Sequence, residues 1–153
     1  AELANRLTSS SGIMRGASVV ILGGPEERAQ AEFVSAMIPA TQRIDLVGKV
    51  DLLTACAVLH QCSLFVGNDS GLMHIAAASG VATVGLFGPS REEHYAPWGS
   101  RSSVVRTKLG YDELVGRPDY DHRTTDSLMG SLAVDDVEEA VVELWHRLGE
   151  TVT

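Results

Sequence analysis

The sequence predicts an α/β fold in which a Rossmann-like parallel sheet carries helices on both faces. Three observations support this fold class: short apolar runs alternate with amphipathic helical segments, the connections are short, and four runs end in glycine-containing turns. With 153 residues, 44% of them hydrophobic, the chain is long enough to bury a core. We therefore expect a single domain over residues 1–153.

The first strand is expected over residues 18–22, where aliphatic residues precede a Gly-Gly-Pro turn. The following helix begins at Pro25, because proline is favoured at the first helical position. Its apolar residues recur every four positions, so this spacing predicts that one face is buried. The predicted buried residues are Ala29, Phe33 and Met37.

Units of the same kind follow, with strands expected over residues 43–47, 64–66 and 81–87. Asp51 is the predicted cap of one intervening helix, and the next helix ends at Gly80. The pattern weakens from Arg91 to Leu132, where only residues 103–106 resemble a strand.

The last helix has a clear apolar stripe: Val137, Val141, Leu144, Trp145 and Leu148. Asp135 is its predicted N-cap, and Glu138, three residues later, completes a capping-box-like pair.

The turns at the strand ends predict a ligand site. Carboxyl ends of parallel strands lie at one edge of a sheet, so residues 23–25, 48–49, 68–71 and 88–90 are expected to share a rim, where open α/β sheets bind ligands. Glycine and proline in any one of these turns are explained by tight turning alone. Lys49 lies on this rim, and both a solvated turn residue and a phosphate contact fit its position.

Residues 68–74, Asn-Asp-Ser-Gly-Leu-Met-His, are the most informative segment. A polar turn between a strand and a helix N-terminus presents free backbone N–H groups and the positive end of the helix dipole, which suits phosphate. Ser70 can cap the helix, Gly71 permits close approach, and His74 lies on the helix face of Ser70. A carboxylate repels phosphate, so Asp69 is expected to cap the helix, hold a sugar hydroxyl or orient His74.

Other classes of function are disfavoured. A net charge of −8 argues against a nucleic-acid surface, and no apolar run approaches the roughly 18 residues of a membrane span. Asn68 stands where a nucleophile elbow has glycine, and three triad residues so close in sequence cannot adopt hydrolase geometry. Residues 119–122, Asp-Tyr-Asp-His, fit a solvated loop better than a metal site.

Four segments resemble the C-terminal domain of glycosyltransferase family 9, the ADP-heptose:lipopolysaccharide heptosyltransferases. They are Val66-Gly67-Asn68-Asp69-Ser70-Gly71-Leu72-Met73-His74-Ile75-Ala76-Ala77-Ala78, Leu86-Phe87-Gly88-Pro89-Ser90, Gly23-Gly24-Pro25-Glu26-Glu27 and Val47-Gly48-Lys49. The resemblance covers residues 1 to about 149 and is strongest over residues 44–90. It implies the C-terminal, donor-binding half of a GT-B fold.

The resemblance also implies which residues bind the donor. Asp69, Ser70, Gly71 and His74 would hold the diphosphate and the sugar. Glu27 would bind the ribose hydroxyls, with Glu26 as the alternative if the turn is shifted by one residue, and Val50 would line the base pocket. The complete set of predicted donor-binding residues is Asp69, Ser70, Gly71, Leu72, His74, Glu27, Lys49, Val50, Gly88 and Ser90.

The implied reaction is an inverting, metal-independent transfer of heptose from ADP-heptose to a lipopolysaccharide core acceptor, without a cofactor. The chain begins within a helical pattern, so we expect a fragment whose general base lies in an absent N-terminal domain and which is inactive alone. The expected partners are a nucleotide-sugar donor, a lipid-linked or oligosaccharide acceptor and that domain. The expected location is cytoplasmic, with at most peripheral association with the inner membrane. A non-catalytic nucleotide-binding module and another GT-B-like enzyme, such as an epimerase, are the alternatives.

Overall fold

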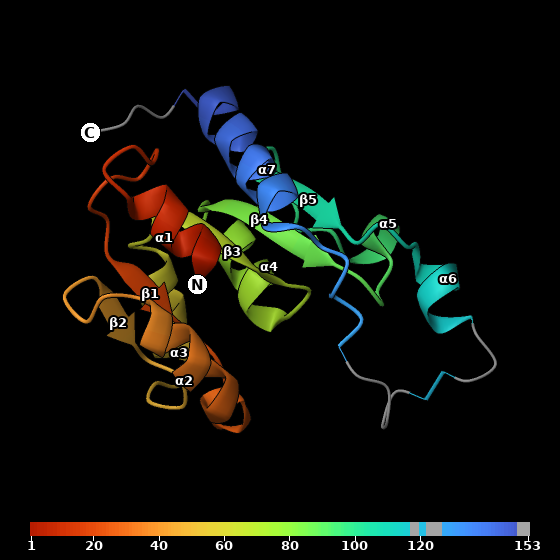
Figure 1. Cartoon of the computed structure of the whole chain (residues 1–153), viewed down its shortest axis with the longest axis horizontal. Helices are drawn as coiled ribbons and strands as arrows, with labels where there is room; N and C mark the ends of the chain where they lie inside the picture. Colours follow the sequence, from red (N-terminus) through yellow and green to blue (C-terminus); the bar gives the residue numbers. More distant parts are fainter. Residues whose placement is uncertain (117–119, 122–126, 150–153) are drawn as a thin grey trace. The chain divides into compact units, whose positions relative to one another are not determined.

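A computed structural model describes residues 1–116, 120–121 and 127–149 (Figure 1). The chain forms two compact units, which meet in sequence between Val58 and Leu59. Each unit contains a parallel sheet and helices, which confirms the predicted α/β class. That residues 1–153 act as one nucleotide-sugar-binding domain stays a prediction.

The first unit contains a two-stranded parallel sheet, in which Val19 is aligned with Arg43 and Ile21 with Asp45. Its elements are α1 (Glu2–Thr8), β1 (Val19–Ile21), a 3-10 helix (Pro25–Glu27), α2 (Arg28–Met37), β2 (Arg43–Asp45) and α3 (Leu52–Leu59), of which Leu59 belongs to the second unit. Pro25 opens the helical segment as predicted, and Asp51 caps α3 by accepting the Thr54 N–H at 2.8 Å.

The predicted buried face of α2 is wrong. Phe33 and Met37 are 78% and 58% exposed, whereas Ala31 and Ser35 are buried. Ala31 and Ser35 are four residues apart, as are Phe33 and Met37, so the spacing alone does not distinguish the two faces of the helix. The Arg43 guanidinium of β2 donates to the backbone carbonyls of Ser35 and Ile38, and these contacts hold the C-terminal end of the helix.

The second unit contains a three-stranded parallel sheet in the order β3-β4-β5. Its elements are β3 (Leu64–Asn68), α4 (Gly71–Ala78), β4 (Ala82–Phe87), α5 (Glu92–Tyr95), β5 (Ser102–Arg106), α6 (Tyr111–Val115) and α7 (Val134–Arg147). The predicted strand over residues 103–106 is therefore confirmed.

Both faces of the central strand β4 are covered. Successive residues Ala82, Thr83 and Val84 are fully buried, although neighbouring side chains on a strand point to opposite faces. Helix α4 packs against β3 and β4, and α7 packs against β4 and β5. Figure 1 shows these two helices on the two sides of the strands. The sheet is thus held between helices, as parallel sheets require.

The apolar stripe of α7 is confirmed, since Val137, Val141, Leu144 and Trp145 are buried. Its predicted capping box is wrong, because Ala133 occupies the N-cap and no side chain caps the helix there. The helix begins at Val134, one residue before Asp135, which places that carboxylate inside the first turn. A negative charge in the first turn still interacts favourably with the helix dipole.

Among the described residues, no helix combines the length and the apolar character needed to cross a membrane.

Candidate functional site

The carboxyl ends of β3, β4 and β5 meet at one edge of the second unit's sheet. Asn68 is aligned with Leu86, and Phe87 with Arg106. The ladder continues past the strands, because the Asp69 N–H donates to the Leu86 carbonyl at 3.3 Å. The turn before α4, the Gly88-Pro89-Ser90 turn and the segment after Arg106 therefore lie along the same edge.

The N-terminus of α4 presents free backbone donors at this edge. Ser70 occupies the N-cap, and Met73 is the first residue of this turn whose N–H donates to the Ser70 carbonyl, at 3.1 Å. The N–H groups of Ser70, Gly71 and Leu72 donate to no described residue. A Cβ placed on Gly71 would meet no heavy atom within 4 Å, so the space on the side-chain side of Gly71 is open.

Ser70 is at the predicted capping position, but its hydroxyl makes no capping hydrogen bond. Its backbone is extended, with φ −158° and ψ 168°, as N-cap residues usually are. The predicted side-chain cap is therefore wrong, and the serine contributes the cap conformation alone. The donors that a capping hydroxyl would occupy stay available.

Asp69 and His74 lie beside each other at the mouth of the helix. The His74 Nε2 is 3.7 Å from Asp69 Oδ1, and the two side chains are 47% and 22% exposed. This separation exceeds that of a hydrogen bond, so it gives an ion pair only when the imidazole is protonated. That Asp69 orients His74 stays a prediction.

Gly88 and Ser90 lie in the turn that follows β4. Gly88 is buried, and a Cβ added there would come within 2.5 Å of Met129 Sδ, so close packing accounts for the glycine. The Gly88 carbonyl accepts a hydrogen bond from Arg106 Nη2 at 2.9 Å. Ser90 is half-buried. Arg106 thus connects the ends of β4 and β5.

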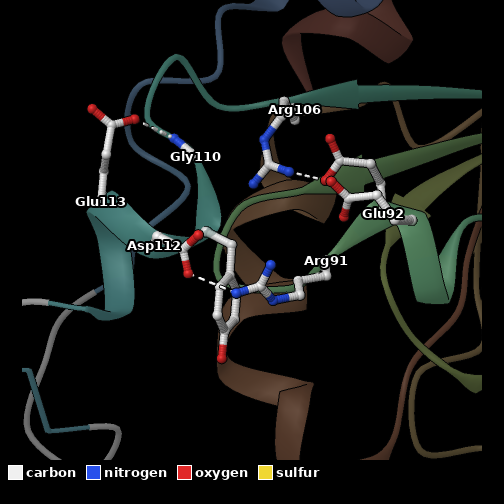
Figure 2. Close-up of a pocket in the computed structure, with 8 residues that line it drawn as sticks. Arg91, Glu92, Arg106, Gly110, Asp112 and Glu113 are labelled. Carbon is white, nitrogen blue, oxygen red and sulfur yellow. Dashed lines mark hydrogen bonds and ion pairs between the residues drawn. The ribbon is translucent and has the colours of Figure 1, made fainter.

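A pocket of about 370 Å³ opens beside this turn, between α5, α6 and the end of β5. Figure 2 shows Arg91 and Asp112 paired on one side of it, and Arg106 and Glu92 paired on the other. None of these four residues was among the predicted site residues. Arg91 directly follows the Gly88-Pro89-Ser90 turn and Arg106 ends the predicted strand, so the position of each at a strand end is a signal that the sequence contains. No sequence signal brings Asp112 to the same place.

In the first unit, the turns after β1 and β2 also meet, because the Gly48 N–H donates to the Gly23 carbonyl at 3.0 Å. Gly48 has a φ of +67°, a conformation that favours glycine. The Glu27 Oε2 accepts the Gly24 N–H at 2.8 Å, which fixes one carboxylate oxygen at this turn. Glu26 and Glu27 are both exposed.

Lys49 and Val50 lie close in sequence to Asp45, which forms an ion pair with Arg28. Arg28 donates two hydrogen bonds to Asp45, at 3.0 and 2.7 Å. These bonds, together with the Val47 N–H, lower the pKa of Asp45 to about 2. The Lys49 Nζ donates to the Asp45 carbonyl at 2.9 Å and is exposed, while Val50 is half-buried.

The described residues contain no group of three or more histidine, cysteine or acidic side chains arranged to hold a metal ion. In the predicted alternative metal segment, residues 119 and 122 lie outside the described part of the chain.

Comparison with known proteins decides the family. The sequence model of glycosyltransferase family 9 (heptosyltransferase) matches residues 1–121 of this 153-residue chain. The chain belongs to glycosyltransferase family 9. Lipopolysaccharide heptosyltransferase 2 of Salmonella typhimurium is 30% identical over 97% of the chain, and lipopolysaccharide heptosyltransferase 2 of Escherichia coli is 32% identical over 74% of it.

Solved structures of family members have the same fold. A family 9 glycosyltransferase from Veillonella parvula superposes with a TM-score of 0.72 at 26% identity, over 86% of this chain and 37% of that one. The E. coli ADP-heptose lps heptosyltransferase II gives 0.74 at 24% identity, over 97% and 40% of the two chains. The chain spans 40% of the S. typhimurium relative and 32% of the E. coli relative named above.

Proposed function

We propose that this chain is the donor-binding part of a glycosyltransferase that moves heptose from ADP-heptose to a lipopolysaccharide core acceptor. Family membership supports transfer of a sugar, and the names of the curated relatives support heptose and a lipopolysaccharide acceptor. The observation that carries the donor-binding part is the open N-terminus of α4. It combines three consecutive free N–H groups with the carboxyl edge of a parallel sheet.

The diphosphate of the donor would lie in front of Ser70, Gly71 and Leu72. Their N–H groups are hydrogen-bond donors, and the helix dipole adds about half a positive charge at the same point. Charge grows on the diphosphate as the bond to the sugar breaks, so these fixed donors would stabilise the transition state more than the ground state.

His74 would contribute a further donor to the departing diphosphate. Its imidazole lies on the helix face of Ser70 and beside Asp69, so a ring N–H can point towards the mouth of the helix. Asp69 would also accept a hydrogen bond from a hydroxyl of the transferred sugar. Gly88 and Ser90 would border the site from the end of β4.

In the first unit, we assign Glu27 to the ribose hydroxyls and Val50 to the base, with Lys49 as a phosphate contact. One oxygen of Glu27 is engaged by the Gly24 N–H, which leaves the other oxygen to accept from a ribose hydroxyl. Lys49 has an exposed ammonium group on a stem anchored near Asp45.

The transfer would invert the anomeric configuration. The acceptor hydroxyl would attack the anomeric carbon as the bond to the diphosphate breaks, ADP would leave, and a general base outside this chain would take the hydroxyl proton. The backbone donors and His74 would do what a metal ion does at other diphosphates, so we propose a metal-independent reaction without a cofactor. We place it in the cytoplasm, with at most peripheral contact with the inner membrane.

Calorimetric titration of the chain with ADP, UDP and GDP tests the donor assignment. ADP is expected to bind most tightly, with equal affinity in EDTA and in Mg²⁺. Preference for UDP or GDP would contradict an ADP-linked donor. Binding that is lost on chelation and restored by Mn²⁺ or Mg²⁺ would contradict the metal-independent mechanism.

A further inference from the structure

The pocket between α5, α6 and the end of β5 has no role in the donor site described above. Its volume of about 370 Å³ is within the range of small-molecule sites. Its walls are formed mainly by charged side chains (Figure 2). The hydrogen-bond donors and acceptors that these side chains do not use within the protein determine which ligand the pocket can bind.

Both guanidinium groups of the pocket are held in place. Arg91 lies over the ring of Tyr111, 4.3 Å from its centre, and its Nη2 is 2.6 Å from Asp112 Oδ1. Arg106 is paired with Glu92 and also donates to the Gly88 carbonyl at 2.9 Å. Arginine has five N–H donors, so each guanidinium retains donors beyond its carboxylate partner, in a fixed direction.

The pocket also contains hydrogen-bond acceptors. Each paired carboxylate has oxygen lone pairs beyond those used by its arginine. Glu93 lines the same pocket, is exposed, and makes no hydrogen bond or ion pair with any described residue. The pocket therefore presents both hydrogen-bond donors and hydrogen-bond acceptors.

This arrangement disfavours other classes of ligand. Two arginines face four acidic residues, Glu92, Glu93, Asp112 and Glu113, so an anion would meet a net negative wall. The described residues form no group of three metal ligands, and an apolar molecule would bury charge without compensation. A neutral, hydroxyl-rich molecule fits, because every hydroxyl both donates and accepts.

We propose that this pocket binds a neutral saccharide ring through its hydroxyl groups. The choice of a carbohydrate over other polyols rests on the proposed glycosyltransferase function. Since Arg106 spans from the pocket to the Gly88 carbonyl, a ring bound here would lie beside the turn that follows β4. The ring belongs either to the acceptor or to the sugar of the donor, and both present the same hydroxyl chemistry.

The test is an NMR titration of the ¹⁵N-labelled chain with glucose, with glucuronate as the anionic counterpart and glycerol as the polyol without a ring. Glucose is expected to cause saturable shifts at Arg91, Glu93 and the Gly110–Glu113 segment, and glucuronate to bind more weakly. No saturation by glucose, tighter binding of glucuronate, or equal affinity for glycerol would overturn the proposal.

Two variants locate the binding. Arg91→Ala removes the half-exposed guanidinium and is expected to weaken glucose binding about 5-fold or more. Arg15→Ala removes an exposed arginine of the first unit and is the charge-matched control, expected to bind as the unchanged chain does. Glu93→Gln leaves the pocket's ion pairs intact, so it tests the pocket even if Arg91→Ala fails to fold. It is also expected to weaken glucose binding.

The source of the ring is resolved by adding ADP and ADP-glucose. Glucose shifts that persist with saturating ADP but are displaced by ADP-glucose identify the donor sugar, whereas shifts that persist with both identify an acceptor subsite. ADP-induced shifts at Ser70–Leu72 report on the proposed function independently. If these shifts appear while glucose fails to bind, the pocket assignment is wrong and the donor site stands. If glucose binds but ADP causes no shifts at these amides, the donor site at α4 is wrong and the pocket assignment stands.

Discussion

The substitution Gly71→Ala separates the stability of α4 from its proposed binding of the diphosphate. A Cβ on Gly71 would meet no heavy atom within 4 Å, and the residue has no positive φ. Alanine therefore fits the unliganded fold. Its higher helix propensity and the lower entropy of its unfolded chain are expected to add about 0.4–1 kcal/mol of stability. At a few degrees per kcal/mol, the melting temperature should rise slightly or stay unchanged.

The binding of nucleotide should change in the opposite direction. The added methyl group occupies space beside the free N–H groups that a bound diphosphate would need, so we expect the loss of at least one hydrogen bond to a charged phosphate oxygen. Such a bond contributes about 1.5–3 kcal/mol, which corresponds to a roughly 10-fold to 100-fold weaker affinity for ADP. Calorimetry measures the affinity and thermal unfolding measures the stability.

Gly130→Ala is the matched control. Gly130 also has open space at its Cβ position and no positive φ, and it lies in a turn outside α4. This variant should bind ADP as tightly as the unchanged chain. If Gly71→Ala retains full affinity while it folds normally, the N-terminus of α4 does not hold the diphosphate.

Three further predictions concern the site and its support. Asp69→Ala and His74→Ala should each weaken the binding of ADP-heptose, because Asp69 would lose its contact with the sugar and His74 its contact with the diphosphate. The melting temperature should change little, since both side chains lie at a loop–helix edge, and a large fall for both variants would make them structural instead. Asp45 has a pKa of about 2 in the folded chain against 3.8 for an unperturbed aspartate, so its ion pair with Arg28 stabilises the fold above about pH 4 and is lost as pH falls towards 2. Urea unfolding across that range should show a shallower pH dependence for Asp45→Asn, and an unchanged slope would contradict the role of the pair. Gly85→Ala should destabilise the second unit by about 1–3 kcal/mol, since its Cβ would lie 2.7 Å from Met73 Sδ and 2.9 Å from Phe87 Cε2; a melting temperature equal to that of Gly130→Ala would refute this packing argument.

The strands were predictable because their signal is local. Apolar runs that end in glycine-containing turns predicted four of the five strands among the described residues, and the weaker apolar run over residues 103–106 predicted the fifth. The parallel pairing follows from the helical segments between strands, since a two-residue turn cannot join parallel neighbours. The stripe of α7 was equally clear, because five large apolar residues mark one face only.

The errors have physical causes. On α2 both candidate faces repeat every four residues, and small Ala31 and Ser35 are buried in preference to Phe33 and Met37. At Ser70 and Asp135, the residue types suit a cap, but side-chain capping depends on rotamer and on the exact helix start. Neither is encoded in local composition.

The candidate site was predicted in part. The strand–turn–helix segment around Asp69 and the turn after β4 follow from the sequence, because both stand at carboxyl ends of strands. The pocket around Arg91 does not, because Asp112 and Tyr111 come from an irregular segment whose return to the edge of the sheet depends on tertiary contacts.

The most direct test of the donor site is an NMR titration of the ¹⁵N-labelled chain with ADP, read at the backbone amides of Ser70, Gly71 and Leu72. Hydrogen bonding to phosphate should shift these three amides most strongly among those of the second unit, with His74 close behind. Saturable binding of ADP that leaves all three amides unmoved would contradict the placement of the diphosphate at the N-terminus of α4.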